Sequence, residues 1–81
     1  MLTVFSKEAC PACVQLVNLL KARGYEFEVK KLDADYTREN LAEMFESKGL
    51  VQPRSFPILF KDEVLVGGLI EAKMAVAKNT L

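Results

Sequence analysis

The segment Cys10-Pro11-Ala12-Cys13 constrains this chain more than any other feature. It follows residues 2–5, an apolar and partly β-branched stretch that is typical of a short strand. Pro11 suits the first position of a helix, where its missing N–H would have no partner anyway. Apolar residues then recur at helical spacing. The sequence therefore predicts a strand, a short loop and a helix that begins between the two thiols.

Hydrophobic periodicity predicts three helices in all. The first begins at Pro11 and stops at Gly24, a residue type that favours helix C-termini. The second has Thr37 as its N-cap and ends at Gly49. The third follows Gly67-Gly68 near the end of the chain. We expect the inner face of this third helix to carry Leu69, Ile70, Lys73, Met74 and Ala77.

Four strands accompany the helices. Alternation over residues 25–32, with Tyr25, Phe27 and Val29 on one face, predicts the second strand. Residues 56–60 and 64–66 predict a third and a fourth, joined as an antiparallel hairpin. A helical crossover between the first two strands favours their parallel pairing. The predicted fold is α/β, in the order β-α-β-α-β-β-α, with a four-stranded mixed sheet flanked by three helices.

Size and charge exclude several classes of protein. With 81 residues, the chain is expected to form a single domain over residues 1–81. Its 11 basic and 11 acidic residues cancel, which argues against a nucleic-acid partner. No apolar run approaches the roughly 18 to 20 residues that span a bilayer, so no membrane partner is expected. The first residues lack a basic leader and a cleavage pattern, so we expect a cytoplasmic protein.

The two cysteines carry the candidate chemistry, because the chain has no histidine. The unpaired N–H groups and the positive end of the dipole at a helix N-terminus favour a thiolate at Cys10. Lys7, three residues upstream, adds positive charge. Cys13 lies one turn into the helix, where its sulfur can meet that of Cys10. The expected roles are a nucleophile at Cys10 and a second thiol at Cys13 that reacts with it.

Two other interpretations of the cysteines remain open. A structural disulfide would close so short a loop that it would constrain the unfolded chain little, and a reducing cytoplasm would oppose it. A zinc site needs four ligands, whereas the chain offers two thiolates and no imidazole. A redox-active dithiol is favoured, and no metal is expected.

Two further segments have both a structural and a functional interpretation. Pro57 either begins a strand or follows a cis bond that directs the Phe56 backbone toward a peptide-like substrate. Gly67-Gly68 is either a strand-to-helix turn or a close approach of backbone to a carboxylate at a helix N-terminus.

With these segments, the chain resembles glutaredoxins, which belong to the thioredoxin-fold superfamily. The resemblance covers nearly the whole length. It is carried by Lys7, by the Cys-Pro-Ala-Cys segment, by residues 56–60 and by Val66-Gly67-Gly68. It implies a thioredoxin-like fold and a thiol–disulfide oxidoreductase, with Cys10 as nucleophile and Cys13 as resolving thiol. It also implies glutathione as co-substrate, with no tightly bound cofactor.

The resemblance also implies a glutathione site. The Phe56 backbone would pair with the cysteinyl part, and Lys7 with Gln52 or Arg54 would hold the glycyl carboxylate. Gly68 and the residues after it would receive the γ-glutamyl end. The implied contact set is Lys7, Pro11, Ala12, Gln52, Arg54, Phe56, Pro57, Gly68, Leu69, Ile70 and Glu71.

The chain departs from the family pattern at several of these positions. Ala12 stands where an aromatic residue is usual, and Ser55-Phe56 where Thr-Val is common. Ile70 and Glu71 stand where a polar residue and Asp are common. Because Ile70 cannot hydrogen-bond the γ-glutamyl carboxylate, these departures predict weak glutathione binding.

The implied partners are glutathione, with glutathione reductase acting indirectly, and disulfide-containing proteins such as ribonucleotide reductase. The chain is expected to be a monomer. An alternative, motivated by Ala12 and Ile70, is a redoxin that thioredoxin reductase reduces and that serves ribonucleotide reductase. A third interpretation is iron–sulfur carriage by a cluster-bridged dimer, against which Pro11 argues, since cluster-binding members usually have a smaller residue there. A non-enzymatic interaction module is the remaining alternative.

Overall fold

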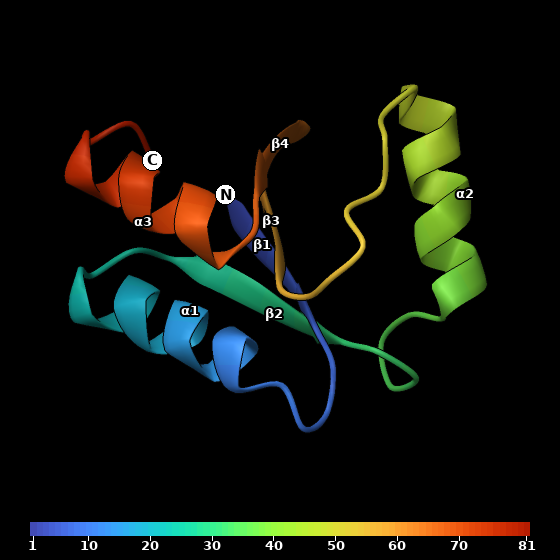
Figure 1. The fold of residues 1–81 in the computed structure, drawn as a ribbon, viewed down its shortest axis with the longest axis horizontal. Coiled ribbons are helices and arrows are strands. Elements are labelled where there is room, and N and C mark those ends of the chain that lie inside the picture. Colours follow the sequence, from blue (N-terminus) through green and yellow to red (C-terminus); the bar gives the residue numbers. More distant parts are fainter.

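The computed structural model describes all residues from Met1 to Leu81. Seven elements follow one another in the predicted order (Figure 1). They are β1 (Leu2–Ser6), α1 (Pro11–Ala22), β2 (Phe27–Lys31), α2 (Arg38–Lys48), β3 (Ile58–Lys61), β4 (Val64–Gly67) and α3 (Leu69–Ala77). None of the three helices is long and apolar enough to cross a membrane.

The strands form one mixed sheet in the order β2-β1-β3-β4. β1 pairs in parallel with β2 and antiparallel with β3, and β3 and β4 form the expected antiparallel hairpin. The predicted fold class is thus confirmed. β1 and β3 are central strands, whereas β2 and β4 each leave one edge of the sheet unpaired.

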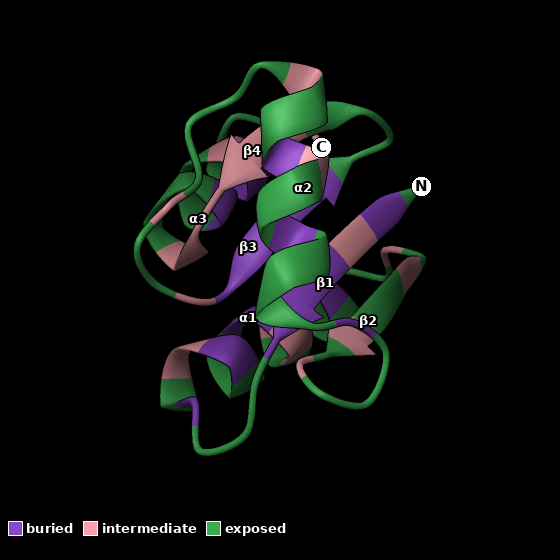
Figure 2. Cartoon of the chain, turned by 90° about the vertical axis from the view of Figure 1, so that its right-hand side faces the viewer, coloured by how far each residue is buried: buried purple, intermediate pink, exposed green.

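The helices lie on both faces of the sheet, with α1 and α3 side by side on one face and α2 on the other (Figure 1). Successive residues of a strand point to opposite faces. Accordingly, Val4 belongs to the core beneath α1 and α3, and Phe5 to the core beneath α2. Figure 2 shows the exposed side of α2 in front of the buried strands. Two separate apolar clusters therefore hold the layers together.

The predicted inner face of α3 is wrong except at Leu69. Ala72 and Val76 are the buried residues of this helix, and Leu69 is half-buried. Ile70, Lys73, Met74 and Ala77 are all exposed. Apolar residues occur on most sides of α3, so spacing alone does not select a face. The small side chain of Ala72 allows α3 to pack beside Leu16 and Leu20 of α1.

The helix termini follow the predicted signals, whereas two strands are shorter than predicted. Thr37 and Asn40 exchange side chain-to-backbone hydrogen bonds at the start of α2, and Gly49 ends it in the left-handed conformation. The third strand begins at Ile58 rather than at residue 56, because Pro57 has no N–H to give to the ladder. β2 begins at Phe27, because the N–H of Tyr25 bonds back to α1.

Candidate active site

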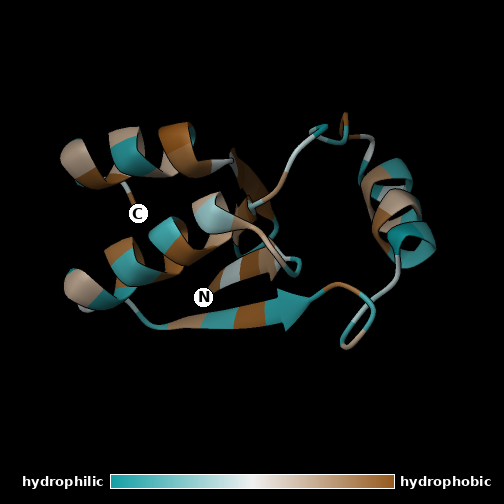
Figure 3. Ribbon diagram, turned by 60° about the horizontal axis from the view of Figure 1, so that its bottom comes forward, coloured by the Kyte–Doolittle hydropathy of each residue, from teal (hydrophilic) through white to brown (hydrophobic).

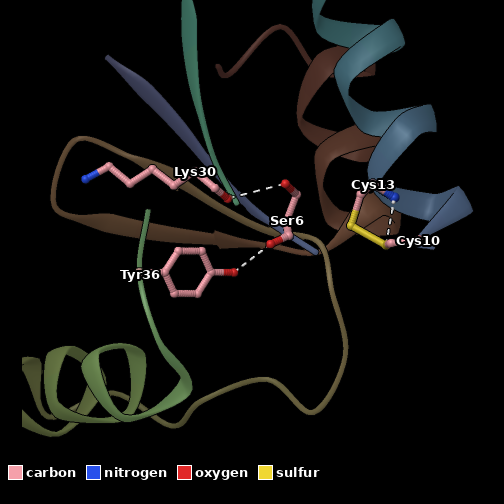
Figure 4. The surroundings of a disulfide bond; sticks show 5 residues. All are labelled: Ser6, Cys10, Cys13, Lys30 and Tyr36. Atoms are coloured by element: carbon pink, nitrogen blue, oxygen red, sulfur yellow. Dashed lines mark hydrogen bonds between the residues drawn. A yellow bond between two sulfur atoms is a disulfide. The ribbon is translucent and has the colours of Figure 1, made fainter. Parts of the chain in front are cut away.

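The two cysteines lie at the start of α1, with Cys10 as its N-cap and Pro11 as its first residue. The sulfurs are joined in a disulfide, and the two Cα atoms are 5.3 Å apart (Figure 4). The N–H of Cys13 donates a hydrogen bond of 3.1 Å to the sulfur of Cys10. The residue that was expected to be the nucleophile therefore has the capping role that usually belongs to an oxygen side chain.

This position has a direct chemical consequence. A thiolate at Cys10 keeps the N–H of Cys13 as a donor and lies at the positive end of the α1 dipole. The first turn of α1 contains no acidic residue that would oppose the thiolate. The two cysteine residues are 7% and 4% exposed, so little of the pair is open to solvent. The pair can cycle between dithiol and disulfide. No three side chains of His, Cys, Asp or Glu gather into a possible metal site.

The strand that precedes the cysteines is anchored from two directions (Figure 4). The hydroxyl of Tyr36 donates a 2.8 Å hydrogen bond to the carbonyl oxygen of Ser6. The buried hydroxyl of Ser6 donates to the carbonyl oxygen of Lys30. These contacts fix the end of β1, four residues before Cys10. The sequence prediction did not single out Tyr36 and missed this role.

Burial of Tyr36 also changes its acidity. Its ring packs edge-on against Phe5, with 5.2 Å between the ring centroids. Loss of solvent raises the pKa of Tyr36 to about 12; the charge of Arg38 opposes the rise and that of Asp33 adds to it. Tyr36 is therefore a neutral hydrogen-bond donor at physiological pH.

The Phe56–Pro57 peptide bond is cis, which is the second of the two interpretations of this segment. Pro57 is buried and Phe56 is half-buried against the α2 core. Two cations lie over the ring of Phe56: the Lys7 ammonium at 5.6 Å and the Arg38 guanidinium at 6.0 Å from the centroid. Lys7 is thus near Phe56, as a shared glutathione site would require. The sequence prediction missed Arg38, since no local signal links the first residue of α2 to the loop before β3.

At the start of α3, the Gly67-Gly68 backbone does approach a carboxylate, but that carboxylate is the side chain of Glu71. The N–H of Gly68 donates a 2.7 Å hydrogen bond to the Oε1 atom of Glu71. The side chain of Glu71 folds over Gly67, which has a φ of +129°; a Cβ there would lie 2.7 Å from Cγ of Glu71. Gly67 is therefore required by both its conformation and its contact. A Cβ at Gly68 would lie 3.4 Å from the carbonyl oxygen of Pro57.

The remaining residues of the predicted glutathione site are less tightly placed. Gln52 and Arg54 are exposed and form no hydrogen bond or ion pair. Pro11 is exposed and Ala12 is half-buried at the start of α1. Ile70 is exposed, whereas Leu69 packs against the core beneath α1 and α3. The geometry therefore links Lys7, Arg38 and Phe56, and leaves the roles of Gln52 and Arg54 as predictions.

Comparison with known proteins extends these observations. The family model described as "Glutaredoxin" matches residues 2–66. A probable glutaredoxin of Synechocystis sp. is 33% identical over 66 residues, which cover 80% of this chain and 69% of that protein.

Solved glutaredoxin structures share the fold over nearly the whole chain. Glutaredoxin 1 from Francisella tularensis, complexed with cacodylate, gives a TM-score of 0.79 at 25% identity, covering 96% of this chain and 93% of that one. A glutaredoxin from Brucella melitensis gives 0.71 at 30% identity, with coverage of 95% and 78%. A buckwheat glutaredoxin–glutathione complex gives 0.79 at 23% identity, with coverage of 99% and 71%, and this likeness concerns the fold alone.

Proposed function

The chain belongs to the glutaredoxin family and is a thiol–disulfide oxidoreductase, and on that premise we propose that it uses glutathione to reduce protein disulfides and glutathione mixed disulfides. The observation that carries this proposal is the Cys10 sulfur at the N-terminus of α1, bonded to Cys13 and hydrogen-bonded to its N–H. The buckwheat glutaredoxin, which shares this fold, has been solved as a complex with glutathione.

The reduction of a substrate disulfide would take two exchanges. The Cys10 thiolate attacks one substrate sulfur, the substrate S–S bond breaks, and the leaving sulfur keeps the electron pair and takes up a proton. Cys13 then loses its proton and attacks the Cys10 sulfur, which releases the second substrate thiol. The substrate gains two electrons, and the Cys10–Cys13 disulfide remains.

Glutathione would return the enzyme to the dithiol state. The thiolate of one glutathione attacks the Cys10 sulfur, so that a mixed disulfide forms and Cys13 takes up a proton. A second glutathione attacks the glutathionyl sulfur, which yields oxidised glutathione and the Cys10 thiolate. This return needs no tightly bound cofactor, because the two glutathione molecules together supply the two electrons.

The charges around Phe56 support a site for the glycyl end of glutathione. Lys7 and Arg38 both lie over its ring. Neither side chain takes part in a salt bridge, so both can pair with a ligand. A carboxylate beside Phe56 would meet two cations. We therefore add Arg38 to Lys7, Gln52 and Arg54 as a candidate for this end of the ligand.

The γ-glutamyl end would meet a less favourable surface. Glu71 already accepts the N–H of Gly68 that an incoming carboxylate would use. Glu71 would attract the γ-glutamyl ammonium but repel its carboxylate, and the exposed Ile70 offers no side-chain donor. We infer weak glutathione binding from this arrangement. The same observation favours the second candidate, a redoxin that thioredoxin reductase reduces.

The compartment and the targets are part of the proposal. A dithiol of this kind works where other thiols are kept reduced, which favours the cytoplasm. Ribonucleotide reductase is one proposed target. The proposed enzyme acts as a monomer, since one chain carries both exchanging thiols.

The electron donor is tested by a coupled assay in which NADPH oxidation is followed with a protein disulfide as acceptor. One reaction contains glutathione and glutathione reductase, and the other contains thioredoxin reductase alone. The proposal predicts turnover in the first. Turnover in the second reaction only would replace the glutathione-linked function by the redoxin function.

A further inference from the structure

A groove with a volume of about 680 Å³ leads away from the cysteine pair, between the first half of α1 and the edge strand β2. Cys10 and Pro11 belong to its lining. Val14 and Val17 of α1 line one side, and Val29 of β2 lines the other. We call this hollow the α1–β2 groove. It is separate from the side chains that surround Phe56, of which it shares only Lys7.

The groove keeps apolar side chains open to solvent. Val14 is 59% exposed and Val29 is 38% exposed, whereas larger apolar side chains of the same elements, such as Leu16 and Phe27, are at least half-buried. β2 is at the edge of the sheet, so no further strand covers Val29. Figure 3 shows apolar bands on β2 beneath α1, with no element beyond the strand. An apolar surface that reaches a reactive cysteine is suited to part of that cysteine's substrate.

The charges around the groove favour an acidic neighbour. Lys7 and Lys31 lie along it, opposed by Glu8. A second hollow shares these three residues with the groove and is also lined by Arg38 and Asp33. Cations thus outnumber acids by three to two over the joined surface.

We propose that the α1–β2 groove binds the polypeptide of a protein substrate on one side of the cysteine that Cys10 attacks. The bound segment is extended and carries an aliphatic side chain and an acidic side chain within about three residues of its cysteine, which is a reach of roughly 10 Å. The aliphatic side chain contacts Val14 and Val29, and the acidic one pairs with Lys31. Two features argue for this occupant: Cys10 belongs to the groove lining, and that lining has two lysines, Lys7 and Lys31, against one acid, Glu8.

The groove would allow the enzyme to favour protein substrates over small disulfides. A substrate polypeptide leaves the attacked sulfur in two directions, and only one of them can run past Phe56. Glutathione, a tripeptide proposed for the Phe56 side, does not need the groove. The inference rests on the thiol–disulfide chemistry of Cys10 and is independent of the proposed use of glutathione.

The test measures single-turnover rate constants with chemically reduced enzyme and no glutathione. The probes are capped peptides whose cysteine is disulfide-bonded to mercaptoethanol, with Leu-Asp before or after it, and matched peptides with Ala-Lys. Hydroxyethyl disulfide is the small reference. In at least one order, the Leu-Asp peptide should react about five to ten times faster than its Ala-Lys counterpart, relative to the reference.

The variants locate this preference on the groove. Val29→Ser should lower the peptide-to-reference ratio about fivefold, and Lys31→Glu should reverse the preference for Asp over Lys. Val64→Ser is the matched control, because Val64 is a 66% exposed valine on the opposite edge strand and should leave the ratio unchanged.

Three outcomes would overturn the inference. The first is an unchanged ratio in both groove variants. The second is an equal loss with the peptide and with hydroxyethyl disulfide, which would show a general effect on reactivity or folding. The third is a dimer at assay concentration that Val29→Ser dissociates, in which case a second copy of the chain fills the groove. Failure of glutathione dependence alone would not alter the ratio.

Discussion

Two helix N-termini meet at the same end of the sheet, and the chain treats them in opposite ways. α1 has a thiol at its N-cap and no acidic residue in its first turn. α3 has Gly68 at its N-cap, and the carboxylate of Glu71 bonds to its N–H. The positive end of one helix therefore remains available to stabilise a reactive sulfur, whereas that of the other is neutralised within the chain.

This difference explains how the site can do its chemistry without histidine. We propose that activation of Cys10 depends on the N–H of Cys13 and on the lack of acidic residues in the first turn of α1, both of which follow from its place on that helix. We propose that the α3 terminus affects substrate choice rather than reactivity, because Glu71 already occupies the N–H of Gly68. The predictions below test this division, from the largest expected effect to the smallest.

Removing the nucleophile should have the largest effect. Cys10→Ser should lower disulfide exchange more than about a thousandfold, because a hydroxyl at this position is not ionised near neutral pH. Cys13→Ser should instead accumulate mixed disulfides with protein substrates, since the first exchange is intact and the second is blocked. Non-reducing electrophoresis with mass spectrometry would detect them. The reverse pattern would exchange the assigned roles of the two thiols.

The start of α1 could be predicted because its signals are local. Each signal acts on backbone within a few residues of itself. Pro11 occupies the first position of α1, and Cys10 and the α2 cap Thr37 accept hydrogen bonds from N–H groups three residues later. Arg38 was missed because its contact with Phe56 connects two segments that only the folded sheet brings together. The face of α3 was mispredicted because apolar residues occur on most of its sides, and Ala72 and Val76 are buried rather than Ile70 and Met74.

Tyr36→Phe tests how far the α1 terminus depends on the anchored end of β1. The free energy of unfolding should fall by about 1 kcal/mol at neutral pH, because the carbonyl of Ser6 loses one of its two donors. Chemical denaturation of both proteins measures this difference. The reactivity of Cys10 should change little if the anchor acts only on stability. A large loss of exchange rate would instead make Tyr36 a positioning residue for the site.

The same tyrosine predicts a dependence on pH. The pKa of Tyr36 is about 12 in the folded chain, against an ordinary value of 10.0. A raised pKa stabilises the fold fully below the unfolded value, and this contribution is lost between the two values. The stability of the parent protein should therefore fall relative to Tyr36→Phe between about pH 10 and pH 12. Parallel stability curves for the two proteins in this range would contradict the assignment.

Neutralising the cations beside Phe56 tests the proposed glycyl end of the site. Lys7→Gln and Arg38→Gln should each raise the KM for glutathione about threefold, a modest effect because both side chains are exposed. Lys73→Gln, on the exposed face of α3, is the control. Salt should weaken glutathione binding to the parent protein more than to either variant. An unchanged KM in both variants would remove these two residues from the glutathione site.

The smallest and most specific effect concerns Glu71. Glu71→Gln retains an oxygen that can accept the N–H of Gly68 but removes the negative charge from the α3 terminus. If that charge repels the γ-glutamyl carboxylate, the KM for glutathione should fall about two- to threefold, while the exchange rate with hydroxyethyl disulfide stays the same. Glu39→Gln, in the first turn of α2, is the matched control, because it also removes an acid from a helix N-terminus. A higher KM in Glu71→Gln would mean that Glu71 holds the γ-glutamyl ammonium. The α3 terminus would then recruit glutathione rather than oppose it, and the contrast with α1 would concern which charge each terminus accepts.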